Sequence, residues 1–286
     1  MTTAVGVMSA AVLTRPGGAE LVELPMPEPK PGQVLVRVEG CGVCASNLPL
    51  WEGRPWFAYP LSPGEPGHEG WGVVESVGDG VDELVGGDRV AMIAGNAFSE
   101  YVAVPAGHCV RIGDAPYPGE PVACAVNIVR RAQIAPADAV AIVGVGFLGS
   151  LVRQLCELRG ADVVAVGRGD EVDGPFARVV ECVGTQAALD RASALVAERG
   201  RLVVAGYHQD GPRVVDMQSW NWRGIDVVNA HERDPLVYVD ALREAVALEL
   251  DVESLLTHRF PLARLRDAFE AARTRPAGFV KAWVAP

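Results

Sequence analysis

A glycine-rich segment between an apolar run and a helical pattern constrains this chain more than any other feature. Residues 144–149 read Gly-Val-Gly-Phe-Leu-Gly, directly after the apolar run 139–143 and before residues 150–158, whose apolar spacing is helical. A second apolar run, 162–166, follows at the distance expected of a βαβ unit. The pattern predicts an α/β chain with a mostly parallel sheet.

Each glycine of this segment has a physical role in the prediction. Gly144 allows a tight turn, Gly146 lets the backbone approach a pyrophosphate, and Gly149 permits close packing of the helix on the strand. Phe147 and Leu148 then begin the helix, whose positive end attracts phosphate. We therefore expect these five residues to bind a dinucleotide cofactor.

The end of the second strand bears on which dinucleotide binds. An acidic residue there usually takes the ribose 2′-hydroxyl of NAD, but this chain has Gly167 followed by Arg168. A guanidinium can pair with a 2′-phosphate. The alternative is that Arg168 is an exposed loop residue and that Asp170 or Glu171 turns back to the ribose. The sequence favours NADP(H), with NAD(H) as the alternative.

A second group of residues has the chemistry of a metal site. Cys44 and His68 offer a thiolate and an imidazole, both good zinc ligands, and a third ligand could be Glu120 or Cys124. Cys41 and Cys44 form a single C-x2-C without a second pair, which argues against a closed four-cysteine site.

In their order along the chain, these motifs resemble those of the medium-chain dehydrogenase/reductase superfamily, in its zinc alcohol and polyol dehydrogenase branch. The resemblance covers nearly the whole chain and is carried by residues 31–38, 40–44, 67–69, 86–90, 120–123 and 144–149. It implies a GroES-like β-rich catalytic domain formed by residues 1–118 and 255–286. It also implies that residues 119–254 form a Rossmann domain with a doubly wound parallel sheet.

The resemblance also implies the residues of the metal site. Zinc is expected on Cys44, His68 and Glu120, because a carboxylate takes the third position in the polyol and threonine dehydrogenase branch. Glu69 is then a neighbouring catalytic carboxylate that can exchange with water on the metal.

The proton relay departs from the family pattern. Ser46 matches the relay hydroxyl, but the histidine that usually ends the relay falls at Pro49, which cannot accept a proton. His231 or His208 could substitute, although either could be an ordinary surface histidine. Asn47 stands where an aspartate usually buttresses the metal histidine, and an amide would orient the imidazole but polarise it less.

The nicotinamide end of the cofactor is expected further along the chain. By resemblance, Val228 and Asn229 contact the carboxamide through their backbone, and Gly206 lies near the same ring.

Two segments of the family pattern are missing. Residues 89–101 continue without the usual four-cysteine lobe, so no structural zinc is expected. Between Arg168 and the apolar run 177–184 only about ten residues remain, which is too few for a βαβ crossover. We therefore expect a shortened sheet that lacks one strand.

Composition excludes several kinds of partner. A net charge of −11 and a pI near 5.0 make nucleic acid or an anionic membrane surface an unfavourable partner. No apolar run reaches the roughly 18 residues that span a bilayer. Six cysteines without a paired framework and the absence of a signal peptide indicate a cytoplasmic protein.

Together these features predict a zinc-dependent oxidoreductase that transfers a hydride between NADP(H) or NAD(H) and a small secondary alcohol or ketone. Glu120 points to polyol, sugar or cyclitol-like substrates, and four aromatic residues could line their pocket or belong to the core: Trp51, Trp56, Phe57 and Tyr59. The alternatives are a metal-free quinone or enoyl reductase and a non-catalytic NADP(H)-binding protein. We also expect a homodimer paired through the strand at 224–228.

Overall fold

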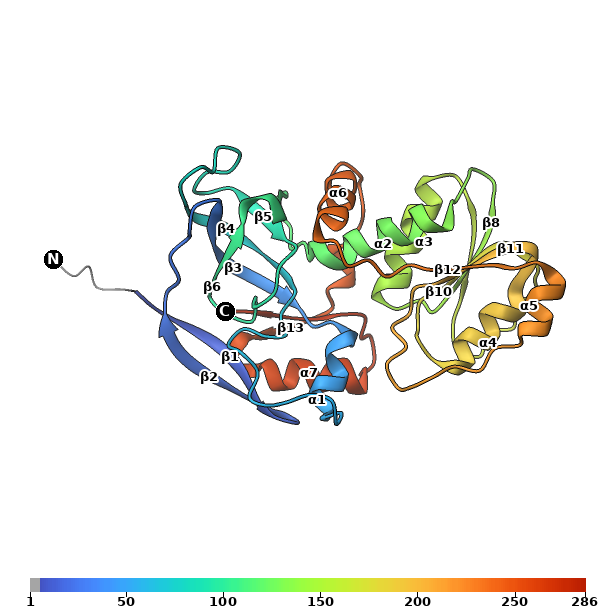
Figure 1. The fold of residues 1–286 in the computed structure, drawn as a ribbon, viewed down its shortest axis with the longest axis horizontal. Helices are drawn as coiled ribbons and strands as arrows, with labels where there is room; N and C mark the ends of the chain where they lie inside the picture. The colour runs from blue at the N-terminus through green and yellow to red at the C-terminus, as the bar shows by residue number, and fades with distance from the viewer. Residues whose placement is uncertain (1–5) are drawn as a thin grey trace. The chain divides into compact units, whose positions relative to one another are not determined.

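The computed structural model describes residues 6–286, which form two compact units (Figure 1). Unit 1 extends to Pro121 and also contains residues 235–246 and 251–286. Unit 2 comprises residues 122–234 and 247–250. The described helices include none with the length and apolar character of a bilayer-spanning segment.

This division differs in detail from the expected domain boundaries. Helix α6 (Pro235–Val246) groups with unit 1, whereas the sequence analysis assigned residues 235–254 to the nucleotide-binding part. Its buried face, which includes Val239 and Leu242, packs with elements of unit 1. Residues 1–5 of the expected catalytic domain lie outside the described residues.

Unit 1 is built on a seven-stranded, mostly antiparallel sheet. The strand order is β13 (His258–Pro261), β14 (Ala282–Ala285), β3 (Gln33–Gly42), β4 (Glu69–Val77), β5 (Arg89–Met92) and β7 (Cys109–Arg111), with β6 (Tyr101–Pro105) also paired to β3. A separate hairpin joins β1 (Val7–Arg15) to β2 (Gly18–Pro25). Gly17 makes its turn with a φ of 64°, a conformation that favours glycine.

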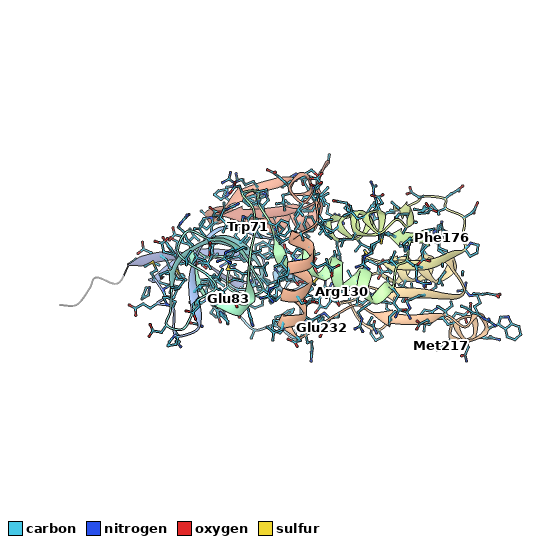
Figure 2. The ribbon with its side chains drawn as sticks, turned by 90° about the horizontal axis from the view of Figure 1, so that it is seen from above. Trp71, Glu83, Arg130, Phe176, Met217 and Glu232 are labelled. Atoms are coloured by element: carbon cyan, nitrogen blue, oxygen red, sulfur yellow. The ribbon has the colours of Figure 1, made fainter. Side chains whose placement is uncertain are left out.

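Aromatic side chains fill the core of unit 1. Trp51 in α1 (Leu48–Glu52) stacks on Phe269 in α7 (Leu265–Thr274), with ring centroids 4.9 Å apart, and α7 lies beside α1 in Figure 1. Trp71, labelled in Figure 2, packs against Trp283 of β14. Trp51 therefore belongs to the core, and of the four aromatic residues considered for the substrate pocket Trp56 is the most exposed, at 61%.

The last strand returns to the sheet of unit 1. β14 pairs antiparallel with β3, with Trp283 opposite Gly42 and Val284 opposite Cys41. This return was expected from the family resemblance. It places Lys281, which directly precedes β14, next to the end of β3 and the start of β4.

Unit 2 contains a five-stranded sheet whose strands all pair in parallel. The order is β12 (Asp226–Asn229), β11 (Val196–Val204), β10 (Phe176–Glu181), β8 (Ala139–Val143) and β9 (Asp162–Val166). Its helices are α2 (Gly119–Ala132, which begins in unit 1), α3 (Phe147–Leu158), α4 (Gln186–Leu195) and α5 (Met217–Arg223). These features confirm the α/β class.

The shortened sheet is also confirmed. β9 lies at the edge, and residues 167–175, which lead from β9 to β10, contain no helix or strand. The strand that would extend the sheet beyond β9 is therefore missing from the described residues.

The carboxyl ends of the five strands meet at one edge, because all five are parallel. Backbone hydrogen bonds of 2.8–3.0 Å tie each end to its neighbour: Gly144 N to Val166 O, Cys182 N to Val143 O, Gly206 N to Glu181 O and Ala230 N to Val204 O. Ligands of open α/β sheets bind at such an edge.

Candidate functional site

Three potential metal ligands come together in unit 1. The ligand atoms of Cys44, His68 and Glu69 all lie within 4.8 Å of one another. Cys44 follows β3, and His68 and Glu69 stand at the start of β4. The register that pairs Gly42 with Glu69 brings these strand ends together. The sequence predicted that these residues belong to one site, and the antiparallel pairing explains their proximity.

The imidazole of His68 is held by a backbone carbonyl. Its Nδ1 donates to the carbonyl oxygen of Pro66 over 2.9 Å, which leaves Nε2 for the cluster. Asn47 was expected to orient this ring directly, but its Nδ2 donates to the same Pro66 oxygen over 3.3 Å instead. The ring's orientation thus depends on Pro66, and Asn47 acts on it only through that carbonyl.

The electrostatics of the cluster favour a positive charge. Burial lowers the pKa of His68, but a hydrogen bond with Cys44 and the charge of Cys44 outweigh burial and raise this pKa from 6.5 to about 10. The charges of Glu120 and Glu69 act in the same direction. A thiolate, an imidazole and a carboxylate are zinc ligands, so the donor set fits that ion.

A buried ion pair holds Glu69. Lys281 Nζ donates to Glu69 Oε1 over 2.6 Å, and the two side chains are 8% and 0% exposed. Burial lowers the pKa of Lys281, but the charges of Glu69, Cys44 and Glu120 and the hydrogen bond to Glu69 together raise it above its ordinary value. The other oxygen of Glu69, Oε2, has no hydrogen-bond partner in the part of the chain that the structure describes. A buried carboxylate oxygen without a partner is costly, and a cation would satisfy it.

Gly42 makes room for this carboxylate. A Cβ atom at Gly42 would lie 1.8 Å from Glu69 Oε2, so any other residue would displace the side chain of Glu69. Sequence reasoning missed both Gly42 and Lys281 as parts of the site. Lys281 carried a signal, because it is one of only two lysines in the chain and stands in an apolar strand pattern.

Glu120 lies near the cluster of Cys44, His68 and Glu69 but is not one of its three members. It is the second residue of α2, and its charge raises the pKa of both His68 and Lys281. Its carboxylate is not among the ligand atoms within 4.8 Å of one another in the described residues. Cys124, half-buried, follows four residues later in α2. The third ligand, Glu120 or Cys124, stays a prediction.

The expected relay residues differ in their surroundings. Ser46 is half-buried two residues after Cys44, and its Oγ lies 3.5 Å from Asn47 Oδ1. His231 is exposed in unit 2. Both ring nitrogens of His208 are occupied, by Glu181 at 3.0 Å and by Arg213 at 2.8 Å.

The predicted cofactor residues lie along the carboxyl edge of the sheet in unit 2. Gly144 has a φ of 100°, and a Cβ there would lie 2.3 Å from the side chain of Val183. A Cβ at Gly149 would lie 1.9 Å from the carbonyl oxygen of Gly144. The turn and the close helix packing therefore both require glycine, as the sequence pattern indicates. Helix α3 begins after Gly146 without a side-chain cap, an arrangement that suits phosphate binding.

The residues expected at the ribose and the nicotinamide lie at the same edge. Asp170 Oδ2 accepts a hydrogen bond of 2.8 Å from Gly167 N, so this carboxylate does turn back to the end of β9. Arg168 is exposed beside it. Val228 and Asn229 are the last two residues of β12. The end of β9 thus carries an exposed guanidinium beside a carboxylate that is bonded to the backbone.

Comparison with known proteins shows similarity to alcohol and sorbitol dehydrogenases. Residues 30–114 match the model of the alcohol dehydrogenase GroES-like domain. An alcohol dehydrogenase of Geobacillus stearothermophilus is 32% identical over 200 residues, which cover 57% of this chain and 59% of that protein. The chain thus spans about three fifths of that relative's length. A sorbitol dehydrogenase of Gallus gallus is 25% identical over 346 residues and 94% of each chain.

A solved structure extends the comparison to the fold. The cobalt- and zinc-bound thermostable alcohol dehydrogenase of Pyrobaculum aerophilum has a TM-score of 0.83 and 27% sequence identity, covering 98% of this chain and 100% of the other. These similarities support the resemblance of the chain to the medium-chain dehydrogenase/reductase superfamily, in its alcohol and polyol dehydrogenase branch.

Lys281→Met should destabilise the protein, because it leaves Glu69 buried without its counter-charge. We expect a loss of about 3–5 kcal/mol in the free energy of unfolding, measured by urea denaturation in the presence of a chelator. Lys281→Arg should lose less. The double variant Glu69→Gln with Lys281→Met should recover most of the loss. A double variant no more stable than Lys281→Met would show that the pair is not the cause.

Proposed function

We propose that this protein is a zinc-dependent oxidoreductase that transfers a hydride between a nicotinamide dinucleotide and a secondary alcohol or ketone. The observation that carries the proposal is the cluster of half-buried Cys44 and His68 with buried Glu69, in which Glu69 Oε2 has no hydrogen-bond partner among the described residues. The glycine-rich carboxyl edge of unit 2 supports the dinucleotide. The alcohol and sorbitol dehydrogenases among its relatives support the substrate class.

Cys44, His68 and Glu120 are the residues we assign to the zinc ion. A zinc ion supplies Lewis acidity that stabilises negative charge on the substrate oxygen, and the dinucleotide accepts the hydride. Glu69 stays close to these ligands because Lys281 holds it by one oxygen. This set of a thiolate, an imidazole and a carboxylate favours the zinc enzyme over a metal-free quinone or enoyl reductase.

Ser46 is the residue we assign to proton transfer. When an alcohol gives up its hydride, Ser46 Oγ would accept the hydroxyl proton and pass it on through the relay to solvent. The products are a ketone and the reduced dinucleotide. His231 is the histidine we assign to the end of the relay, since the ring of His208 is already bonded at both nitrogens.

Oxidation of secondary alcohols tests the proposal directly. The metal-loaded protein should oxidise members of a panel of simple alcohols, polyols and cyclitols with NADP⁺ or NAD⁺. Ser46→Ala should keep zinc and cofactor but lower kcat by roughly 10²–10⁴-fold, the usual contribution of positioned proton transfer. Ser76→Ala, an exposed serine in the same unit, is the matched control.

Two results would contradict this assignment. Wild-type kcat in Ser46→Ala would mean that the proton leaves by another route. A protein that binds dinucleotide but oxidises none of the alcohols and reduces none of the corresponding ketones would instead fit a non-catalytic binding protein.

NADP(H) is the cofactor we favour, on account of Arg168. Arg168→Ala should raise the Kd of NADPH by about 10- to 100-fold, the loss of one charge-assisted contact, and leave that of NADH nearly unchanged. Asp170→Asn tests the alternative that Asp170 binds the ribose of NAD(H). In that case this substitution should raise mainly the Kd of NADH. Fluorescence titration gives both constants. An equal loss for both cofactors in Arg168→Ala would assign Arg168 a structural role.

A homodimer is the assembly we propose. β12 ends the sheet of unit 2, and three exposed apolar residues lie near it in the chain: Val214, Met217 and Trp222 (Met217 is labelled in Figure 2). An open strand edge beside apolar surface suits pairing with a second copy. Light scattering should give twice the chain mass of 30.2 kDa, and Trp222→Glu should lower it. A monomer at micromolar concentration would refute the dimer.

A further inference from the structure

Side chains bind the segment that follows β11 to the turn that follows β10. The two segments meet at the carboxyl edge of the sheet in unit 2. At the far end of the contact, Gln186 exchanges two hydrogen bonds with the backbone of Val214, at 2.8 and 2.9 Å. Three residues closer to the sheet, Glu181, His208 and Arg213, make the rest of the connection.

Glu181 is the buried anchor of this connection. It is the last residue of β10, and its side chain is fully buried. Oε1 accepts hydrogen bonds from Val183 N at 2.6 Å and Gly184 N at 2.7 Å, so this oxygen fixes the turn after β10. Oε2 is left for His208 Nε2 at 3.0 Å.

His208 bridges the carboxylate to a guanidinium. Arg213 Nε donates to His208 Nδ1 over 2.8 Å, so Nδ1 carries no proton. The ring proton is therefore on Nε2, which donates to Glu181 Oε2. The imidazole is neutral, has one tautomer and bonds at both nitrogens. It acts as a rigid link and has no ring nitrogen left to relay a proton.

Arg213 completes the connection. Its Nη2 donates to the carbonyl oxygen of Gly184 over 2.8 Å and also pairs with Asp210. Its side chain is only 14% exposed. Arg213 therefore touches both segments, the turn after β10 through Gly184 and its own segment through Asp210 and His208.

The backbone held in this way lies at the cofactor edge. A Cβ at Gly206 would lie 2.1 Å from Gly184 N and 2.6 Å from Glu181 Oε2, so the two segments meet here with room for glycine only. Tyr207 follows directly between Gly206 and the anchored His208. A shift in the bonds of His208 would therefore move the backbone of Gly206 and Tyr207.

We propose that Glu181, His208 and Arg213 form a strap that fixes the backbone of Gly206 and Tyr207 where the nicotinamide end of the dinucleotide binds. The inference rests on the proposed function and on the family resemblance, which implies that the nicotinamide lies near Gly206. The strap is a positioning device, and none of its members transfers a proton or a hydride. A segment that is already ordered binds its ligand more tightly, because less conformational freedom is lost on binding.

Binding of whole cofactors and of their nicotinamide-free halves tests the strap. His208→Ala should raise the Kd of NADPH or NADH by about 10- to 100-fold, while that of 2′,5′-ADP or 5′-AMP changes by less than about threefold. His208→Gln should bind like the wild type, because a glutamine amide can donate to Glu181 and accept from Arg213. Arg213→Met should reproduce the selective loss, and Arg153→Ala, a half-exposed arginine on α3, should not.

Hydrogen exchange gives a second measurement without cofactor. The amides of residues 206–214 should exchange faster in His208→Ala and at the wild-type rate in Arg153→Ala. Equal weakening of whole cofactors and halves, or wild-type binding of NADPH and NADH by His208→Ala, would overturn the strap. A wild-type protein that binds neither dinucleotide would instead overturn the proposed function, and the role of the strap with it.

Discussion

The buried pair of Lys281 and Glu69 joins the strands that bring together Cys44, His68 and Glu69, the candidate metal cluster. Lys281 comes from the far end of the chain, and Glu69 begins β4, yet both meet at the end of β3. Removing two charges from water costs several kcal/mol for each ion. Their mutual attraction offsets this cost only when the two groups are in close contact. Lys281 donates to Glu69 Oε1, while Glu69 Oε2 has no hydrogen-bond partner among the described residues. Gly42 keeps the space that this arrangement needs.

The proposed dinucleotide site of unit 2 requires backbone groups that can come close to a flat, charged ligand. Gly144, Gly149 and Gly206 each stand where a Cβ would collide with neighbouring backbone or side-chain atoms. The loss of one strand beyond β9 leaves this edge intact. Gly144 follows β8, and β8 still has a neighbouring strand on each side, β10 and β9. A shortened sheet can therefore keep the glycine turn after β8, where phosphate would bind, and still lack the strand beyond β9, on the side where adenine would bind.

Much of this fold could be predicted from the sequence. The glycine segment between an apolar run and a helix indicated the parallel sheet, and the short stretch after Arg168 indicated the missing strand. Cys44 and His68 could be paired because their motifs resemble those of a family. Lys281 could not be found this way, since its contact with Glu69 spans 212 residues and depends on the register of β14 against β3. The bridging role of His208 also depended on a loop conformation that no periodicity encodes.

Zinc K-edge absorption spectroscopy of the purified protein tests the central claim most directly. We predict about one zinc per chain, with one sulfur ligand near 2.3 Å and nitrogen or oxygen ligands near 2.0–2.2 Å. Cys44→Ser should remove the sulfur shell, and Cys124→Ser should leave it unchanged. A sulfur shell that survives Cys44→Ser, or a metal-supplemented protein that holds no zinc, would contradict the assignment of this cluster as the metal site.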